Sequence, residues 1–147
     1  MSCIRFNTPA QREAMRLHAP VQLSPDEVKA LHPAPPVTQS KINRLRLLAE
    51  SENPKIRASV ASSYHAPDEL YVALANDPDE EVRSWVARNE TVSCDILRTL
   101  ADDPSEKVRG FLAINFFVPS DVMEQLSTDD SETVRRLVQW KTQLAEA

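Results

Sequence analysis

Four arginines recur at intervals of 26 residues, at Arg57, Arg83, Arg109 and Arg135. A row of guanidinium groups could grip an acidic partner, or each planar fork could fill a fixed hydrogen-bonding role inside the fold. Acidic and carbonyl groups lie within reach in the turn before each arginine, such as Asp77 for Arg83 and Asp103 for Arg109. Binding sites usually vary between units, whereas structural features repeat. We therefore interpret the four arginines as a structural ladder.

Side chains that differ between units are better candidates for binding a partner. Ser59, Trp85, Phe111 and Leu137 share a position one residue before the core valines, which favours core packing over partner contact. A second position holds Ser62, Arg88, Ile114 and Trp140, and a third holds Ala58, Ser84, Gly110 and Arg136. We expect these last two positions to line an inner, concave surface, while Trp140 could instead seal the C-terminal end. The predicted partner-binding residues are Arg88, Ile114, Arg136 and Trp140, with Trp85 and Phe111 as further members.

No arrangement of residues typical of catalysis is visible. The two cysteines, Cys3 and Cys94, and the three histidines are scattered, so we expect neither a metal site nor a cofactor. A single glycine is too few for a phosphate-binding loop or a dinucleotide fingerprint. We expect Cys94 to be a partly buried, inert thiol. The chain is therefore predicted not to be an enzyme.

The elements that must position these residues repeat with the same period. Leucine recurs at 48, 74, 100 and 126, and a β-branched residue precedes each ladder arginine, at 56, 82, 108 and 134. Each unit of the repeat reads as two short helices. In the unit after Leu74, we expect Asp77 to cap the first helix, Pro78 to lie in its first turn and Asn89 to end it in the left-handed conformation. Helix pairs of this length bury their apolar faces by stacking, which predicts an all-α protein built as an α-solenoid.

The chain before the first full unit has a different composition. Residues 38–50 predict a helix with Ile42, Leu45, Leu48 and Ala49 turned inward, equivalent to the second helix of an incomplete unit. Residues 1–37 are rich in proline and predict an N-terminal cap or arm. Within them we expect a helix over residues 8–18, a second helix opened by the capping box at residues 24–27, and an extended connector over 32–36.

The run from Leu74 to Asn89, LANDPDEEVRSWVARN, resembles the leucine-rich repeat variant family, whose unit is roughly L-A-x-D-P-x-x-x-V-R-x-x-V-A-x-N. The match continues at Leu100–Arg109, is looser at Leu48–Ser63 and Leu126–Lys141, and covers residues 45–141. It implies a HEAT-like, right-handed superhelix of about four two-helix units, some helices short or 3₁₀-like, that serves as an interaction scaffold. A relative in that family carries an iron–sulfur cluster on a Cys-rich segment. Here residues 1–37 contain only Cys3, so no cofactor is carried over.

Charge is unevenly distributed along the chain. The net charge is −5, yet residues 1–47 hold seven Lys or Arg against three Asp or Glu, and residues 48–147 hold ten against nineteen. An acidic repeat domain over residues 38–147 disfavours nucleic acid as a partner. Apolar runs are too short for a membrane span, and free thiols favour a cytoplasmic location.

Three functions remain open from the sequence. The first is a non-catalytic scaffold that binds an unknown protein or peptide, possibly a basic one. The second is a regulatory or assembly subunit that self-associates, as a homodimer, through its basic N-terminal arm. The third and least favoured is an enzyme like the HEAT-like alkylpurine DNA glycosylases, which use a concave, basic surface.

Overall fold

The structure is a computed structural model that describes residues 37–146, and these residues form eight α-helices and no β-strand. The described helices all belong to one unit of the chain, Val37–Ala147. The elements expected at residues 8–18, 24–31 and 32–36 lie outside the described residues. The helices of the described part are α3 Gln39–Ala49, α4 Pro54–Ala61, α5 Asp68–Ala75, α6 Glu80–Arg88, α7 Cys94–Leu100, α8 Glu106–Ile114, α9 Ser120–Ser127 and α10 Glu132–Glu146. None of them is of the 3₁₀ type.

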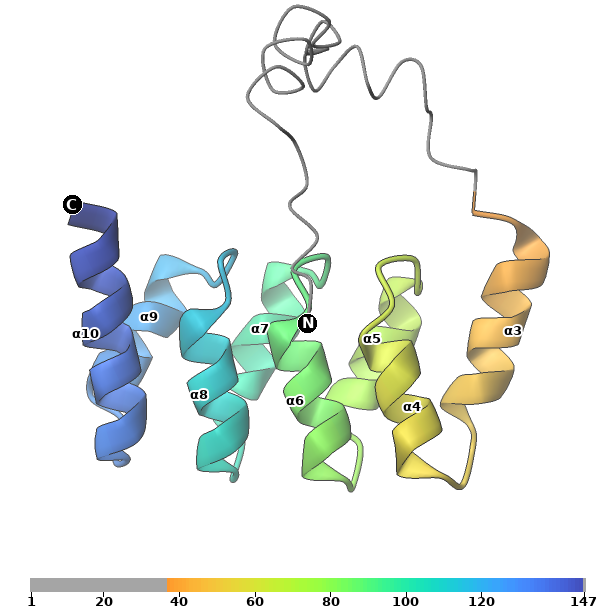
Figure 1. Cartoon of the computed structure of the whole chain (residues 1–147), viewed down its shortest axis with the longest axis horizontal. Coiled ribbons are helices and arrows are strands. Elements are labelled where there is room, and N and C mark those ends of the chain that lie inside the picture. Colours follow the sequence, from red (N-terminus) through yellow and green to blue (C-terminus); the bar gives the residue numbers. More distant parts are fainter. Residues whose placement is uncertain (1–36, 147) are drawn as a thin grey trace, which may run out of the picture. The chain divides into compact units, whose positions relative to one another are not determined.

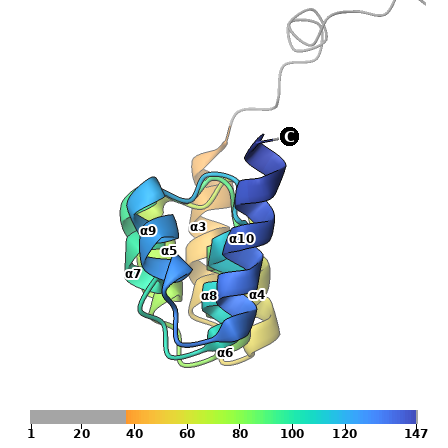
Figure 2. The ribbon, with the colours of Figure 1, turned by 90° about the vertical axis from the view of Figure 1, so that its left-hand side faces the viewer.

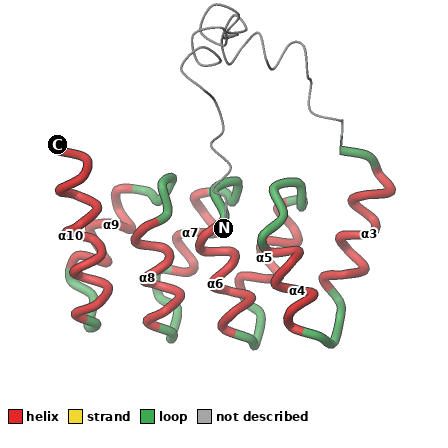
Figure 3. The backbone as a smooth tube through the Cα atoms, viewed as in Figure 1, coloured by secondary structure: helices red, strands yellow, loops and turns green. Residues whose placement is uncertain are grey.

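The described helices stack in two rows. Helices α4, α6, α8 and α10 lie side by side in one row, and each contacts the next (Figure 1). Helices α5, α7 and α9 form the second row behind it, as the view along the rows shows (Figure 2). Helix α3 contacts both α4 and α5, which agrees with its reading as the second helix of an incomplete unit. Short loops join the two rows at both ends of the helices (Figure 3).

The core lies between the two rows and consists of the residues that repeat in the sequence. The first row contributes fully buried valines at Val82, Val86, Val108 and Val134. The second row contributes the equivalent leucines Leu74, Leu100 and Leu126. Burying one such side chain is worth about 1.5–3 kcal/mol, so the repeated apolar positions account for the stacking of these short helices.

Helices of the first row begin differently from the sequence-based prediction. Helix α4 begins at Pro54 after Asn53, whose side chain accepts a hydrogen bond from the Lys55 amide. In the next unit the predicted cap at Asp77 is wrong, because α6 begins at Glu80 and its N-cap is Asp79. The Asp77 carboxylate is buried and accepts the Asp79 amide at 2.9 Å. It therefore organises the turn before the helix instead of capping the helix.

The asparagines that end the first-row helices are not left-handed caps, contrary to the prediction. Asn89 has φ −74° and ψ 123°, and Asn115 has φ −61° and ψ 130°, which is extended backbone. Both side chains are buried and reach into the preceding unit. The Asn89 amide donates to the Ala61 carbonyl at 2.8 Å and to the Ser63 carbonyl at 3.0 Å. Asn115 repeats the first contact one unit later, on the Ala87 carbonyl at 2.8 Å.

The last unit has Lys141 at the position that Asn89 and Asn115 hold in the two units before it. Its ammonium donates to the Asn115 carbonyl. This bond is equivalent to the one that the Asn115 amide makes to the Asn89 carbonyl one unit earlier. Burial lowers the pKa of Lys141, because the ammonium group is held partly out of water. The inter-unit bond thus continues into α10 with a different side chain.

We predict that Asn89→Ala lowers the free energy of unfolding by about 1–3 kcal/mol, because it leaves the buried Ala61 carbonyl without its amide donor. Urea denaturation followed by circular dichroism measures the effect. Asn76→Ala is the matched control, since the Asn76 side chain bonds its own helix on the surface. Equal losses in the two variants would contradict an inter-unit role for Asn89.

Candidate partner-binding surface

The ladder arginines join each unit to the next through paired hydrogen bonds. Arg83 donates from Nε to one Asp103 carboxylate oxygen at 2.7 Å and from Nη2 to the other at 3.1 Å. Its third donor, Nη1, bonds the carbonyl of Asp77 at 2.8 Å. The same geometry joins Arg57 to Asp77 and Arg109 to Asp129. All three arginine side chains and their aspartates are largely buried.

The carboxylate partners therefore differ from those the sequence suggested. The turn before Arg83 supplies a carbonyl, and the ion pair is made with Asp103, twenty residues ahead in the following unit. Arg135 keeps only the carbonyl contacts, to Asp129 and Asp130, and pairs with no carboxylate among the described residues. The ladder thus has three complete ion pairs within residues 37–146.

These contacts shift the acidity of the paired groups. The hydrogen bond from Arg109 holds the pKa of Asp129 below its ordinary value of 3.8, against the opposing effect of burial. Burial raises the pKa of Asp77, but hydrogen bonds from Arg57 and the Asp79 amide outweigh it, so that its pKa is lowered as well. The charges of Arg57, Arg83 and Arg109 are consequently neutralised within the fold and are not available to a partner.

The varying side chains lie on the outer face of the row α4, α6, α8 and α10, which we call the variable face. It comprises the two positions held by Ser59, Trp85, Phe111 and Leu137 and by Ser62, Arg88, Ile114 and Trp140. Trp85, Phe111 and Leu137 are half-buried and pack against the core. Arg88, Ile114 and Trp140 are exposed, with Ile114 at 41% and Trp140 at 54%. Five of the six predicted binding residues therefore share this face.

The third expected position behaves differently in three of the four helices, and there its assignment to the surface is wrong. Ala58, Ser84 and Gly110 are buried. A Cβ added at Gly110 would lie 3.3 Å from a methyl of Leu137 on α10, so the small side chain permits the close approach of the two helices. Arg136 holds this position in α10, is exposed, and pairs with Glu132 on the same helix.

Arg88 is held between two aromatic rings. Its guanidinium carbon lies 4.4 Å from the centroid of the Trp85 ring and 4.8 Å from that of Phe111 on the next helix. Both distances are within the range of a cation–π contact. The sequence did not predict this stack, because it joins residues of two units. It fills the space between α6 and α8 on the variable face.

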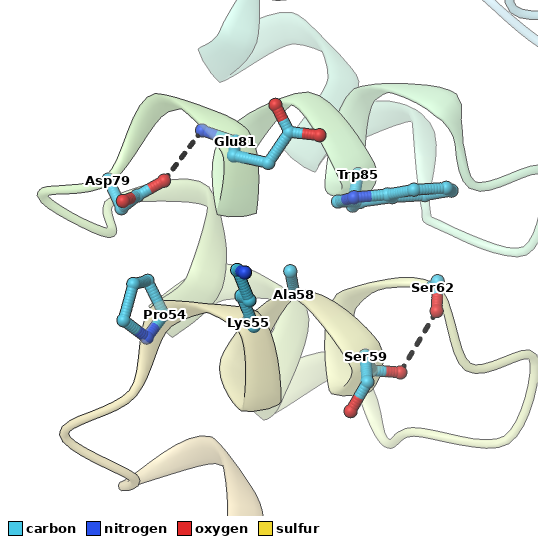
Figure 4. A pocket seen from close by; sticks show the side chains of 8 residues that line it. All are labelled: Pro54, Lys55, Ala58, Ser59, Ser62, Asp79, Glu81 and Trp85. Carbon is cyan, nitrogen blue, oxygen red and sulfur yellow. Dashed lines mark hydrogen bonds between the residues drawn. The ribbon is translucent and has the colours of Figure 1, made fainter.

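A groove of about 590 Å³ lies between α4 and α6, where the corresponding side chains are small. Figure 4 shows its floor, formed by Ala58, Ser59 and Ser62 of the α4 segment, with the Trp85 indole seen edge-on above them. One face of the indole therefore looks into the groove. A smaller hollow of about 130 Å³ shares Ser62 and Trp85 and continues to Tyr64 and Arg88. We call these two spaces, which share Ser62 and Trp85, the α4–α6 groove.

Further apolar side chains are exposed in the loop after α8 and on α10. Phe116 and Phe117, in the loop after α8, are 75% and 52% exposed and contact each other edge to face at 5.0 Å. Trp140 and Leu144 lie four residues apart on α10 and are both exposed. Neither ring is buried against the turn that carries it. In the sequence the pair stands out as an apolar dipeptide where other units have Tyr64-His65 and Glu90-Thr91.

Other chemistry is sparse in the described part of the chain. Cys94, expected to be partly buried, is exposed at the start of α7. Among residues 37–146, no group of three or more His, Cys, Asp or Glu side chains is placed to hold a metal ion. In the same range no helix has both the length and the apolar character needed to cross a membrane. Comparison with known proteins gives no match to a family model, a curated protein or a solved structure.

The pKa shift of Asp129 predicts a pH dependence of stability. Because its folded pKa lies below 3.8, this group adds stability above that pH and loses it as the pH falls through the folded pKa. We expect Asp129→Asn to melt at a lower temperature than the wild type at pH 6, and the difference to shrink below pH of about 4. Thermal melts by circular dichroism between pH 6 and about 2.5 measure this.

Asp95→Asn is the control for that series. Asp95 also bonds an arginine, Arg98, but its side chain is 92% exposed, so its contribution should be small throughout. A stability difference for Asp129→Asn that stays constant with pH would show that the charge of Asp129 is not what stabilises the ladder.

Proposed function

We propose that the chain is a right-handed α-solenoid of the leucine-rich repeat variant type, with about four units, that acts as a non-catalytic scaffold for a partner protein or peptide. Two rows of short helices with the same inter-unit bonds every 26 residues support this architecture. Extended surfaces that bind peptides are a common use of such arrays. The proposed partner surface is the variable face.

One observation carries the proposal. The ladder arginine is the same in all four units, whereas a position on the variable face changes from Ser62 to Arg88, Ile114 and Trp140. The constant set provides a fixed frame, and the changing set gives each unit its own surface chemistry. An exposed tryptophan, an isoleucine and an arginine are residue types that contribute strongly to interfaces. The proposed surface therefore combines apolar anchors with charged neighbours.

The alternatives are less well supported by the described residues. The hypothesis of an enzyme like the DNA glycosylases requires a surface of free basic groups. Arg57, Arg83 and Arg109 are instead neutralised by carboxylates. Self-association through the N-terminal segment is favoured by one observation, the opposite charge balance of residues 1–47 and 48–147. It remains the second candidate, and the experiment below separates the two.

We predict that Ile114→Ser/Trp140→Ala abolishes capture of a partner that the wild-type chain retains from host extract at low salt. Leu47→Ala/Val72→Ser is the matched control, because it removes exposed apolar side chains from α3 and α5 instead. Mass spectrometry identifies the retained protein, and calorimetry with that protein purified should show affinity weakened about 5–30-fold in the first variant only.

Identical capture by both variants, with thermal melts equal to that of the wild type, would show that the variable face is not the binding surface. Capture of nothing by any bait, together with a sedimentation mass that rises with protein concentration and falls with added salt, would favour self-association instead.

A further inference from the structure

The α4–α6 groove differs from the neighbouring space between α6 and α8 in one respect. Between α6 and α8, the guanidinium of Arg88 lies against Phe111 of the following helix. Lys107 of α8 reaches back to the Glu81 carboxylate on α6 and lies 3.8 Å from Glu80. Cationic side chains thus occupy this part of the variable face, over an aromatic ring and beside acidic groups.

The repeat allows the two spaces to be compared residue by residue. Ser62 precedes Arg88 by 26 residues, and Trp85 precedes Phe111 by the same number. The equivalent of the Arg88–Phe111 contact is therefore a contact between residue 62 and Trp85. Serine is too short to make it, and the Ser62 hydroxyl instead donates to the Ser59 carbonyl at 3.0 Å. The ring face of Trp85 that a cation would cover is left facing the groove (Figure 4).

The charge of the surrounding domain favours a cationic occupant. Asp79 and Glu81 line the groove from α6 and Lys55 lines it from α4, while Glu81 is also paired with Lys107 of α8. The domain that surrounds it, residues 48–147, carries nineteen acidic against ten basic residues. A cation over an indole gains from the ring quadrupole, and arginine makes such contacts more often than lysine.

We propose that the α4–α6 groove receives an arginine side chain from a basic segment of the partner, with its guanidinium over the face of Trp85 opposite Arg88. The inserted arginine would take the place that Arg88 takes in the next unit. This inference rests on the proposed scaffold function and names the chemistry of what is bound. It assigns Trp85 as the aromatic platform and Ser62 as the residue whose small size leaves the groove open.

The probe is the peptide acetyl-Gly-Arg-Gly-Arg-Gly-amide, added to the ¹⁵N-labelled full chain. Its control has citrulline in place of both arginines, which keeps the shape and removes the charge. The readout is the indole N–H signal of Trp85, distinguished from that of Trp140 with the variant Trp140→Phe. We expect the Trp85 signal to shift with the arginine peptide, and the citrulline peptide to bind roughly two- to thirty-fold more weakly, the range that a cation–π contact supplies.

Two variants test the position of the site. Ser62→Arg should block the peptide, because it places a guanidinium of the chain itself over Trp85, as Arg88 lies over Phe111. Ser127→Arg adds the same charge at an exposed position on α9 and should leave binding unchanged. Thermal melts show whether each variant is folded, and the comparison of the two peptides on the wild-type chain stands without any variant.

Each remaining outcome has a defined meaning. Equal binding of the two peptides, or binding that survives in a folded Ser62→Arg chain, overturns the proposal. A shift at Trp140 alone overturns the groove as the arginine site while leaving the variable face as a binding surface. The Trp85 signal could instead change with protein concentration, and stop changing when Arg5, Arg12 and Arg16 are replaced by glutamine. That result would overturn the proposal of a separate partner, because the arginine would then come from the N-terminal segment of this chain. Loss of captured partner in Ile114→Ser/Trp140→Ala is read independently, so the proposed function can stand when this inference fails.

Discussion

The guanidinium of Arg83 is bonded to groups from two successive units, the Asp103 carboxylate ahead of it and the Asp77 carbonyl behind it. Since Asp77 is itself the carboxylate partner of Arg57, the turn before each helix is held from both sides. Placing such charges largely out of water is costly, and a fully bonded fork is the arrangement that offsets the cost. The exposed pairs Arg46–Glu69 and Arg98–Asp121 also join units but are screened by solvent, so they contribute less.

Buried asparagines complete the same link on the opposite ends of the helices. Asn89 and Asn115 bond carbonyls of the preceding unit, while the arginines bond carboxylates of the following one. Each short first-row helix is therefore fixed at its start and at its end by directional contacts. Apolar packing alone is non-directional and would allow the rows to slide, because one valine can replace another. The polar contacts set the register, and the valines and leucines supply most of the burial.

A frame fixed in this way allows the outer residues to change without loss of the fold. Between α6 and α8, the rings of Trp85 and Phe111 cover the Arg88 guanidinium. Between α4 and α6, the small side chains of Ser59 and Ser62 leave a groove. On α10, Trp140 is exposed. The functional proposals depend on this division. They treat the constant residues as architecture and read chemistry only from the residues that differ between units.

The helices were predictable from the period of the sequence, and the errors concern helix ends and contacts between units. The spacing of apolar residues predicted the helix over 38–50 and the two-helix units. This was possible because the residues of one helical face recur at fixed intervals within a single segment of the sequence. The partner of Arg83 could not be read in this way, since aspartates lie both six residues before it and twenty after it. Ser84 was expected at the surface but is buried, and burial by other parts of the fold cannot be read from the spacing of one segment. The Trp85–Arg88–Phe111 stack likewise requires the distance between two helices.

A double-mutant cycle on Arg83 and Asp103 tests the central claim most directly. The free energies of unfolding of the wild type, Arg83→Ala, Asp103→Ala and the double variant are measured by urea denaturation. If the inter-unit fork is what fixes the stacking, the coupling energy should be about 1.5–3 kcal/mol, the usual worth of hydrogen bonds to charged groups. Single-variant effects that add up to within about 0.5 kcal/mol would contradict the claim, because they would show that the two side chains stabilise the fold independently.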